Sequence, residues 1–199
     1  MEPNSDPVEA STSGIYVAQA RLVDIEAIGK LSHCRGLAEW SNDSYADAIE
    51  SKYYELLAAF DRGIVVGFIL TRLLGNGLGD LSRMLEVVDA DGRSESMETR
   101  KVTTCYEFEI CNIAVAEEIE GRGLGKLLLD SACFKSIGGS RGVVYLEARV
   151  SNKRAIEFYT RNGFQIDGIR KNYYKNPLED AILMTLKIEQ NYEPQLHKP

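Results

Sequence analysis

Residues 113–126 read IAVAEEIEGRGLGK, and the rest of the chain is organised around this stretch. Three apolar residues suit the end of a buried strand, and an acidic connector, Glu117 to Glu120, leads to a glycine-rich turn and an apolar helix beginning near Leu124. A strand, a glycine turn and a helix start leave several backbone N–H groups free for an anion such as pyrophosphate. Alone, the turn could equally be a tight strand-to-helix connection, because neither the dinucleotide nor the Walker glycine motif fits.

The composition is that of one globular domain, with 199 residues, 44% hydrophobic and 27% charged. A net charge of −7 argues against a nucleic-acid surface. No apolar run approaches the roughly 20 residues that span a bilayer. Four cysteines without C-x-x-C spacing and only two histidines give no basis for a metal site. The acidic N-terminus lacks an apolar secretory segment, so we expect a cytoplasmic protein with neither nucleic acid nor membrane as partner.

Hydrophobic periodicity predicts strands and helices along the chain. The first half is expected to contain a strand at Ile15–Ala20, helices at Leu22–Leu31 and Ser44–Ser51, a hairpin of Tyr53–Phe60 and Ile64–Leu73, and a long excursion at 75–101. The second half is expected to contain strands at Cys105–Val115, Gly142–Val150, Phe164–Lys171 and Ala181–Ile188, and helices at Gly123–Ile137 and Asn152–Asn162, the latter capped by Ser151 or Asn152.

The alternation of strand and helix in the second half predicts an α/β (α+β) sheet with a parallel pair in its middle. If Glu109–Val115 and Val143–Arg149 are parallel neighbours, their carboxyl ends face one crevice, and the glycine turn opens onto it. Glu147, Asn152 and Tyr159 would then converge there, since Asn152 and Tyr159 lie two helical turns apart on one face.

Each of these residues also has a structural interpretation. Glu147 lies within an apolar strand, where a carboxylate must be hydrated or paired. Taken alone it could be the salt-bridge partner of Arg149 or Arg141, and Tyr159 could be a packing residue. The combination of these residues with Asn152 and the glycine turn favours a catalytic interpretation.

Together these residues resemble the GNAT N-acetyltransferase superfamily, most closely its protein N-terminal type, that of the bacterial ribosomal-protein alanine acetyltransferases. The superfamily motif Gln/Arg-x-x-Gly-x-Gly/Ala falls on Glu120, Gly123 and Gly125, with Glu120 where Gln or Arg is usual. The run LEARVSN…AIEFYTRNGF at 146–164 matches a subfamily run with one change in each half. Further similarity covers Arg170–Tyr174, Glu179–Ala181, Glu39-Trp40-Ser41 and Tyr45, and the whole resemblance spans Ile15 to Ile188 except 75–101.

The resemblance implies a fold: a central mixed, mostly antiparallel sheet of about seven strands, with a parallel pair splayed at the acetyl-CoA site and about four flanking helices. It implies one domain at 14–188, with 75–101 inserted between the third and fourth strands. The polar ends, 1–13 and 189–199, are expected to be a disordered tail and a frayed tail.

The resemblance also assigns roles. Glu147 resembles the general base, which an α-amine needs before it can attack a thioester, and Tyr159 the general acid that protonates the departing thiolate. Trp40, Tyr173 and Tyr174 would line the acceptor groove. The implied cofactor contacts, chiefly through the backbone, are Ile113, Ala114, Val115, Gly121, Arg122, Gly123, Leu124, Gly125, Lys126 and Asn152, and Glu120 is expected to weaken rather than abolish cofactor binding.

The sequence therefore predicts an acetyl-CoA-dependent enzyme that needs no metal and acetylates the N-terminal amine of a protein. The acceptor would be ribosomal protein S18 alanine or a broader set of N-termini. Acetylation of a lysine side chain or a small amine is an alternative. A non-catalytic acyl-CoA-binding module is a second alternative, although such a module would need neither Glu147 nor Tyr159.

Overall fold

An eight-stranded sheet forms the centre of the protein in a computed structural model that describes residues 8–9, 14–37, 40–78, 104–137 and 140–189. The strands are β1 (Val8–Glu9), β2 (Ile15–Gln19), β3 (Tyr54–Asp61), β4 (Ile64–Leu78), β5 (Thr104–Val115), β6 (Arg141–Arg149), β7 (Gln165–Lys175) and β8 (Leu178–Ile188). The helices are α1 (Ile25–Cys34), α2 (Asn42–Glu50), α3 (Leu124–Ile137) and α4 (Lys153–Arg161), with 3₁₀ turns at Leu22–Asp24 and Glu117–Ile119.

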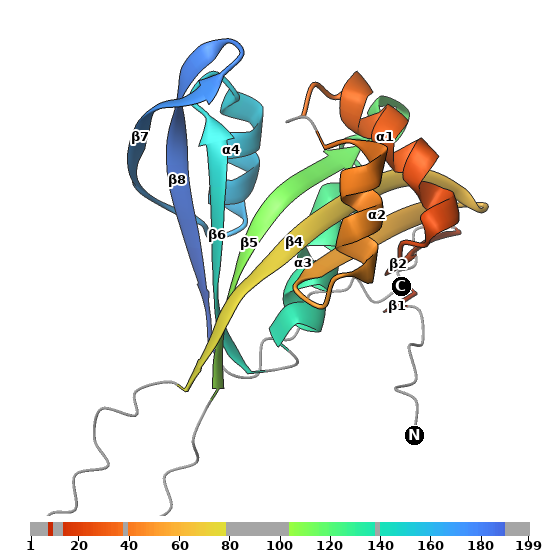
Figure 1. Cartoon of the computed structure of the whole chain (residues 1–199), viewed down its shortest axis with the longest axis horizontal. Coiled ribbons are helices and arrows are strands. Elements are labelled where there is room, and N and C mark those ends of the chain that lie inside the picture. Colours follow the sequence, from red (N-terminus) through yellow and green to blue (C-terminus); the bar gives the residue numbers. More distant parts are fainter. Residues whose placement is uncertain (1–7, 10–13, 38–39, 79–103, 138–139, 190–199) are drawn as a thin grey trace, which may run out of the picture.

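The strands lie in the order β1-β2-β3-β4-β5-β6-β8-β7 (Figure 1). All neighbours are antiparallel except β5 and β6, which are parallel. A parallel pair needs a crossover connection, and α3 supplies it. The predicted mixed, mostly antiparallel sheet with one parallel pair is confirmed, and β1 adds a two-residue strand to the seven longer ones.

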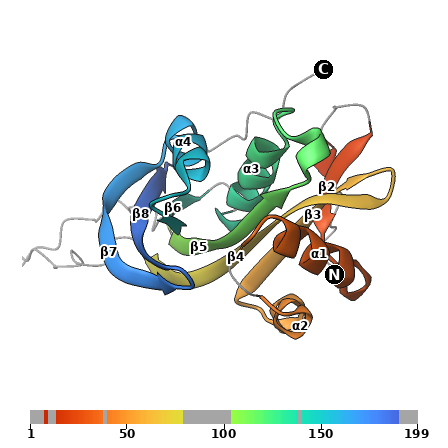
Figure 2. The ribbon, with the colours of Figure 1, turned by 90° about the horizontal axis from the view of Figure 1, so that it is seen from above.

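The two faces of the sheet carry separate hydrophobic clusters. On one face α3 and α4 cover a cluster that includes Leu57, Ile69 and Val144. On the other face α1 and α2 cover a second cluster that includes Leu56 and Phe68. Figure 2 shows the two helix pairs on opposite sides of the sheet. Adjacent residues of β3 alternate between the clusters because side chains alternate across a strand.

Local sequence explains where several elements begin and end. The β3–β4 hairpin turns at Arg62 and Gly63, which both have positive φ, +49° and +81°. Ser41 caps α2, because its hydroxyl accepts a hydrogen bond from the backbone N–H of Ser44. The chain leaves α4 through Gly163 at φ +90°, the conformation that a glycine after a helix commonly takes.

Three boundaries differ most from the predictions, and the others lie within three residues of them. Val8 and Glu9 lie in the expected disordered tail but pair with β2, and the rest of 1–13 lies outside the described residues. β4 continues to Leu78, opposite Thr104, so residues 75–78 belong to the sheet and not to the excursion. The remainder of the predicted excursion falls within 79–103, which lies outside the described residues. Residues 190–199 of the predicted C-terminal tail also lie outside them. β7 runs to Lys175 because its antiparallel partner β8 begins at Leu178. In each case cross-strand hydrogen bonds outweigh weak strand propensity.

Candidate active site

The parallel pair separates halfway along its length, as Figure 1 shows. The register of β5 with β6 runs from Cys105 opposite Arg141 to Ile110 opposite Leu146. Beyond this point β5 stays paired with β4, as far as Val115. The edge of β5 that faces β6 is therefore left free in the middle of a sheet, with backbone N–H and C=O groups available to a ligand.

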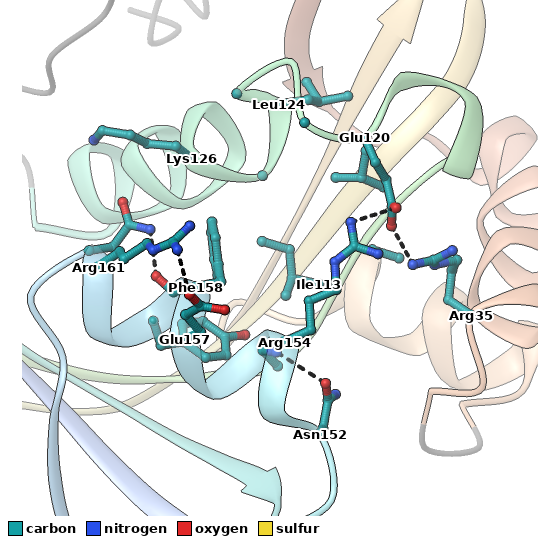
Figure 3. A pocket seen from close by; sticks show the side chains of 18 of the residues that line it. Arg35, Ile113, Glu120, Leu124, Lys126, Asn152, Arg154, Glu157, Phe158 and Arg161 are labelled. Carbon is teal, nitrogen blue, oxygen red and sulfur yellow. Dashed lines mark hydrogen bonds and ion pairs between the residues drawn. The ribbon is translucent and has the colours of Figure 1, made fainter.

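A pocket of about 720 Å³ opens at this separation. The size lies within the range of small-molecule sites, about 300–1,000 Å³. One wall comes from the end of β5, the following turn and the start of α3, and the other wall from α4 (Figure 3). The lining contains these predicted cofactor residues: Ile113, Ala114, Val115, Gly121, Gly123, Leu124, Gly125, Lys126 and Asn152.

The glycine turn contains positive φ angles, a conformation in which residues other than glycine are strained. Gly121 and Gly123 have φ of +75° and +80°, and a Cβ at either position would meet nothing within 4 Å. Conformation therefore requires glycine at these two positions. Gly125 is different, because a Cβ there would lie 3.4 Å from Phe158 of α4. The turn delivers the chain to the start of α3, whose first N–H groups favour an anion.

The two polar groups of the Asn152 side chain, its oxygen and its NH₂ group, can serve different partners. Its Oδ1 accepts a hydrogen bond from the backbone N–H of Ala155 at 3.1 Å, which makes Asn152, and not Ser151, the cap of α4. Its side-chain NH₂ group carries two donors in addition to this acceptor. Since Asn152 lines the pocket, those donors can serve a ligand carbonyl.

Tyr159 lines the same pocket from α4 and is only 5% exposed. Its ring contacts those of Phe158 and Phe164, with centroids 5.2 and 5.3 Å away. Burial raises the pKa of Tyr159 well above the ordinary value for tyrosine, because the phenolate would lose its hydration. The side chain is thus held as a neutral phenol, whose O–H group can donate a hydrogen bond.

Glu147 lies on the other face of β6. Its neighbours Leu146 and Ala148 are buried in the cluster under α3 and α4, so the alternation of the strand directs Glu147 away from that cluster. Its carboxylate is 14% exposed and lies 2.6 Å from Nη1 of Arg170. The hydroxyl of Tyr173 also donates to it, and this hydrogen bond raises the pKa of Tyr173 to about 12.

The arginines that the sequence suggested for Glu147 pair elsewhere. Arg149 Nη1 lies 3.1 Å from Glu179, and Arg141 Nε lies 3.3 Å from Glu189. The ion pair of Glu147 comes instead from β7, a strand that is distant in sequence but brought close through β8.

The remaining predicted residues lie outside the pocket lining. Tyr174 is next to Glu147 and donates its hydroxyl hydrogen to the Glu147 backbone carbonyl at 3.2 Å. Trp40 packs on the α1–α2 face, with its ring centroid 5.7 Å from those of Tyr45 and Tyr54. Among the described residues, the lining omits Glu147, Trp40, Tyr173, Tyr174 and Arg122. Glu39, next to Trp40 in the matched element, lies outside the described residues.

Sequence reasoning missed nine residues of the lining, which are Arg35, Leu37, Ile119, Arg154, Ala155, Glu157, Phe158, Arg161 and Asn162. Arg154 and Phe158 could have been found, because they lie on the same helix as Asn152 and Tyr159. Arg35 and Leu37 carry no such signal, since they follow α1 and reach the pocket only through the tertiary fold.

Two further searches cover only the described part of the chain. No group of three or more His, Cys, Asp or Glu side chains there could hold a metal ion. No helix described there is long and apolar enough to cross a membrane.

Comparisons with known proteins agree with this geometry. A sequence model of the acetyltransferase (GNAT) family matches residues 25–164. A Bacillus subtilis protein provisionally named ribosomal protein bS18-alanine N-acetyltransferase is 28% identical over 175 residues, 87% of this chain and 96% of its own length. The ribosomal protein bS18-alanine N-acetyltransferase of Salmonella typhimurium is 43% identical over 86 residues, which are 41% of this chain and 57% of that protein. The crystal structure of Arabidopsis thaliana NAA60 in complex with acetyl-CoA has a TM-score of 0.67 at 18% identity, covering 87% of this chain and 98% of that one.

Proposed function

This chain belongs to the acetyltransferase (GNAT) family, and we propose that it transfers the acetyl group of acetyl-CoA to the free N-terminal amine of a protein. The observation that carries the proposal is the separation of β5 and β6 beyond Ile110 and Leu146, at the pocket onto which the glycine turn opens. A thread-like ligand with amide groups can lie along the free edge of β5 while its pyrophosphate meets the turn.

The pocket suits acetyl-CoA at both ends of that ligand. The backbone N–H groups at Gly121 to Lys126 would hold the pyrophosphate, and Lys126 adds a positive charge that pairs with Asp130 at 2.6 Å. The backbone of Ile113 to Val115 and the amide of Asn152 would bind the pantetheine. The acetyl-CoA named in the NAA60 complex supports this choice of cofactor.

The acceptor would approach from the opposite face of the sheet. Glu147, Tyr173 and Arg170 meet on that face, and Tyr174 lies beside the separation with its hydroxyl on the Glu147 backbone carbonyl. An amine bound there would meet the thioester through the gap between the two strands. Holding amine and thioester together in this way contributes much of the rate acceleration in a direct transfer.

The reaction needs one proton acceptor and one proton donor. The α-amine must lose a proton to attack the thioester carbonyl, and Glu147 would accept it. Because Arg170 and Tyr173 already occupy this carboxylate, we expect the proton to pass through a water. The CoA thiolate leaves as the amide forms, and Tyr159, a neutral phenol in the pocket, would protonate it.

The acceptor class is inferred from the named relatives. The bS18-alanine enzymes act, by their names, on the alanine of a ribosomal protein. We therefore propose a protein N-terminus with a small first residue, alanine above all, as the acceptor of this chain.

The test is the release of CoA from acetyl-CoA with short peptides that begin with free Ala, Ser, Met or Gly. A peptide with a blocked N-terminus and an internal lysine serves as control. Turnover confined to the free N-termini is expected, with Ala preferred. Turnover on the blocked lysine peptide would shift the assignment to side-chain acetylation. Tight acetyl-CoA binding with no turnover on this panel or on spermidine would favour a binding module.

A further inference from the structure

Glu120, the residue before the glycine turn, is bound by two arginines from different parts of the fold. Arg154 Nη2 of α4 lies 2.6 Å from its Oε2, and Arg35 Nη2, just after α1, donates to its Oε1. The carboxylate is 19% exposed, so it is largely withdrawn from water. Both arginines are basic and also line the pocket.

The Glu120–Arg154 bond joins the two walls of the pocket. Glu120 belongs to the connection between β5 and α3, whereas Arg154 lies in the first turn of α4 beside the cap Asn152. Figure 3 shows Arg154 extending past Ile113 toward Glu120, with Arg35 reaching the same carboxylate from the other side. An internal anion thus occupies two guanidinium groups at the position where the chain enters the phosphate turn.

A carboxylate at this position has two effects, and both oppose the binding of an anionic ligand. It repels a neighbouring phosphate, and it engages the two guanidinium groups that could bind that phosphate in bidentate fashion. The three side chains carry a net charge of +1, and the exposed carboxylate of Glu117, 4.0 Å from Arg35 Nη1, offsets part of this surplus. A pyrophosphate in the turn offers the arginines more acceptor oxygens and more negative charge than Glu120 does.

We propose that Arg35 and Arg154 are additional phosphate-binding residues of this pocket, and that Glu120 occupies them until the ligand's pyrophosphate displaces its carboxylate. The inference rests on the proposed function, since it takes acetyl-CoA as the ligand. Glu120 is expected to weaken cofactor binding, and the proposal gives the reason: its carboxylate competes with the pyrophosphate for the two arginines.

The experiment measures the dissociation constant of acetyl-CoA by calorimetry for the unaltered chain and for Glu120→Gln. The variant should bind about three- to fivefold more tightly, the size expected when partly exposed charge pairs are released. Arg154→Gln should weaken acetyl-CoA binding by a larger factor when it is combined with Glu120→Gln than when it is introduced alone. In the combined variant the substitution removes an arginine that is free to bind phosphate, whereas in the unaltered chain Glu120 already occupies that arginine. S-acetylpantetheine, which lacks the pyrophosphate, should bind both chains equally.

Glu55→Gln is the matched control. Glu55 forms a comparable bridge between elements, 2.7 Å from Lys135 with 24% of its side chain exposed, and it does not line the pocket. Its affinity for acetyl-CoA should be unchanged. Unchanged or weaker acetyl-CoA binding by Glu120→Gln, or equal tightening for S-acetylpantetheine, would overturn the inference and leave the proposed function standing. Failure of the unaltered chain and all variants to bind acetyl-CoA would overturn both.

Discussion

Arg170 Nη1 lies 2.6 Å from Oε1 of Glu147, so the proposed base is ion-paired from β7, across the intervening strand β8. The pair belongs to the face that would receive the acceptor, whereas Tyr159 lies in the pocket on the other face. The proposed base and acid are therefore separated by the plane of the sheet. They can act on one reaction only where that sheet is open, which is beyond Ile110 and Leu146.

Glu147→Gln should lower turnover on a free-amine peptide by about 100-fold or more, since it removes the proposed proton acceptor. The dissociation constant of acetyl-CoA should hardly change, because Glu147 does not line the pocket. Glu109→Gln is the control: it breaks a pair of the same length, 2.6 Å to Arg72, on the neighbouring strand. Normal turnover in Glu147→Gln at neutral pH would remove Glu147 as the base.

Tyr159→Phe should keep the ring packing and lower turnover by about 100-fold, since only the proton donor is lost. Tyr45→Phe should show the reverse pattern. Its hydroxyl lies 3.1 Å from Ser32 Oγ and 3.4 Å from Asn112 Nδ2, so the loss should cost about 1–2 kcal/mol of unfolding free energy without affecting turnover. Thermal melting and CoA release measured on both variants separate the two outcomes.

The pH profile gives a second test of Tyr159. Because burial raises its pKa, the phenol stays protonated as pH rises past the α-amine pKa of about 8 and on to the ordinary tyrosine value of about 10. Turnover should rise as the amine deprotonates and should show no fall below about pH 10. An alkaline loss of turnover near pH 8 would contradict the raised pKa of Tyr159. The same loss persisting in Tyr159→Phe would show that a group other than this phenol titrates.

Gly123→Ala should weaken acetyl-CoA binding and lower stability by about 1 kcal/mol, because alanine is strained at φ +80°. Gly63→Ala is a close match, since Gly63 has φ +81° and likewise nothing within 4 Å of an added Cβ, but it lies in the β3–β4 turn. It should lose similar stability and keep its affinity. Equal affinities in the two variants would show that the turn does not hold the phosphates.

Asn152→Asp should preserve the cap of α4 and still weaken acetyl-CoA binding. Aspartate caps a helix as well as asparagine does, so the melting temperature should hold. The side-chain donors disappear and a negative charge is added, which opposes an anionic ligand. Ser41→Ala, which removes the cap of α2, should have the opposite result: about 1 kcal/mol less stability at unchanged affinity.

Replacing residues 79–103 with a two-residue turn should leave a folded protein that binds acetyl-CoA. Leu78 and Thr104 are direct partners in the β4–β5 ladder, and a two-residue connection can join such a pair. This boundary follows from the structure, because a cut at 76–100 would remove paired strand residues. The proposed single domain at 14–188 predicts one cooperative melting transition in the shortened chain. Loss of cooperativity would show that the removed segment contributes to the core.

The sequence alone determined the order of the elements, the parallel pair and the pocket wall formed by the glycine turn. These features depend on local or periodic signals: alternation in β6, a cap at Ser151 or Asn152 that the structure assigns to Asn152, and glycines at 121 and 123 that tolerate positive φ. Residues 146–164 place Glu147, Asn152 and Tyr159 at fixed spacing on one strand and one helix, so their approximate positions follow from chain geometry.

Only the tertiary structure decided which side chains meet. Arg170 reaches Glu147, and Arg35 reaches Glu120, across 23 and 85 positions of sequence respectively. No local pattern marks such partners, because an ion pair depends on which strands and helix ends the fold brings within about 4 Å. The same holds for the opposite faces occupied by Glu147 and Tyr159. Sequence spacing placed them near one crevice, and the packing of the two hydrophobic clusters assigned each its side of the sheet.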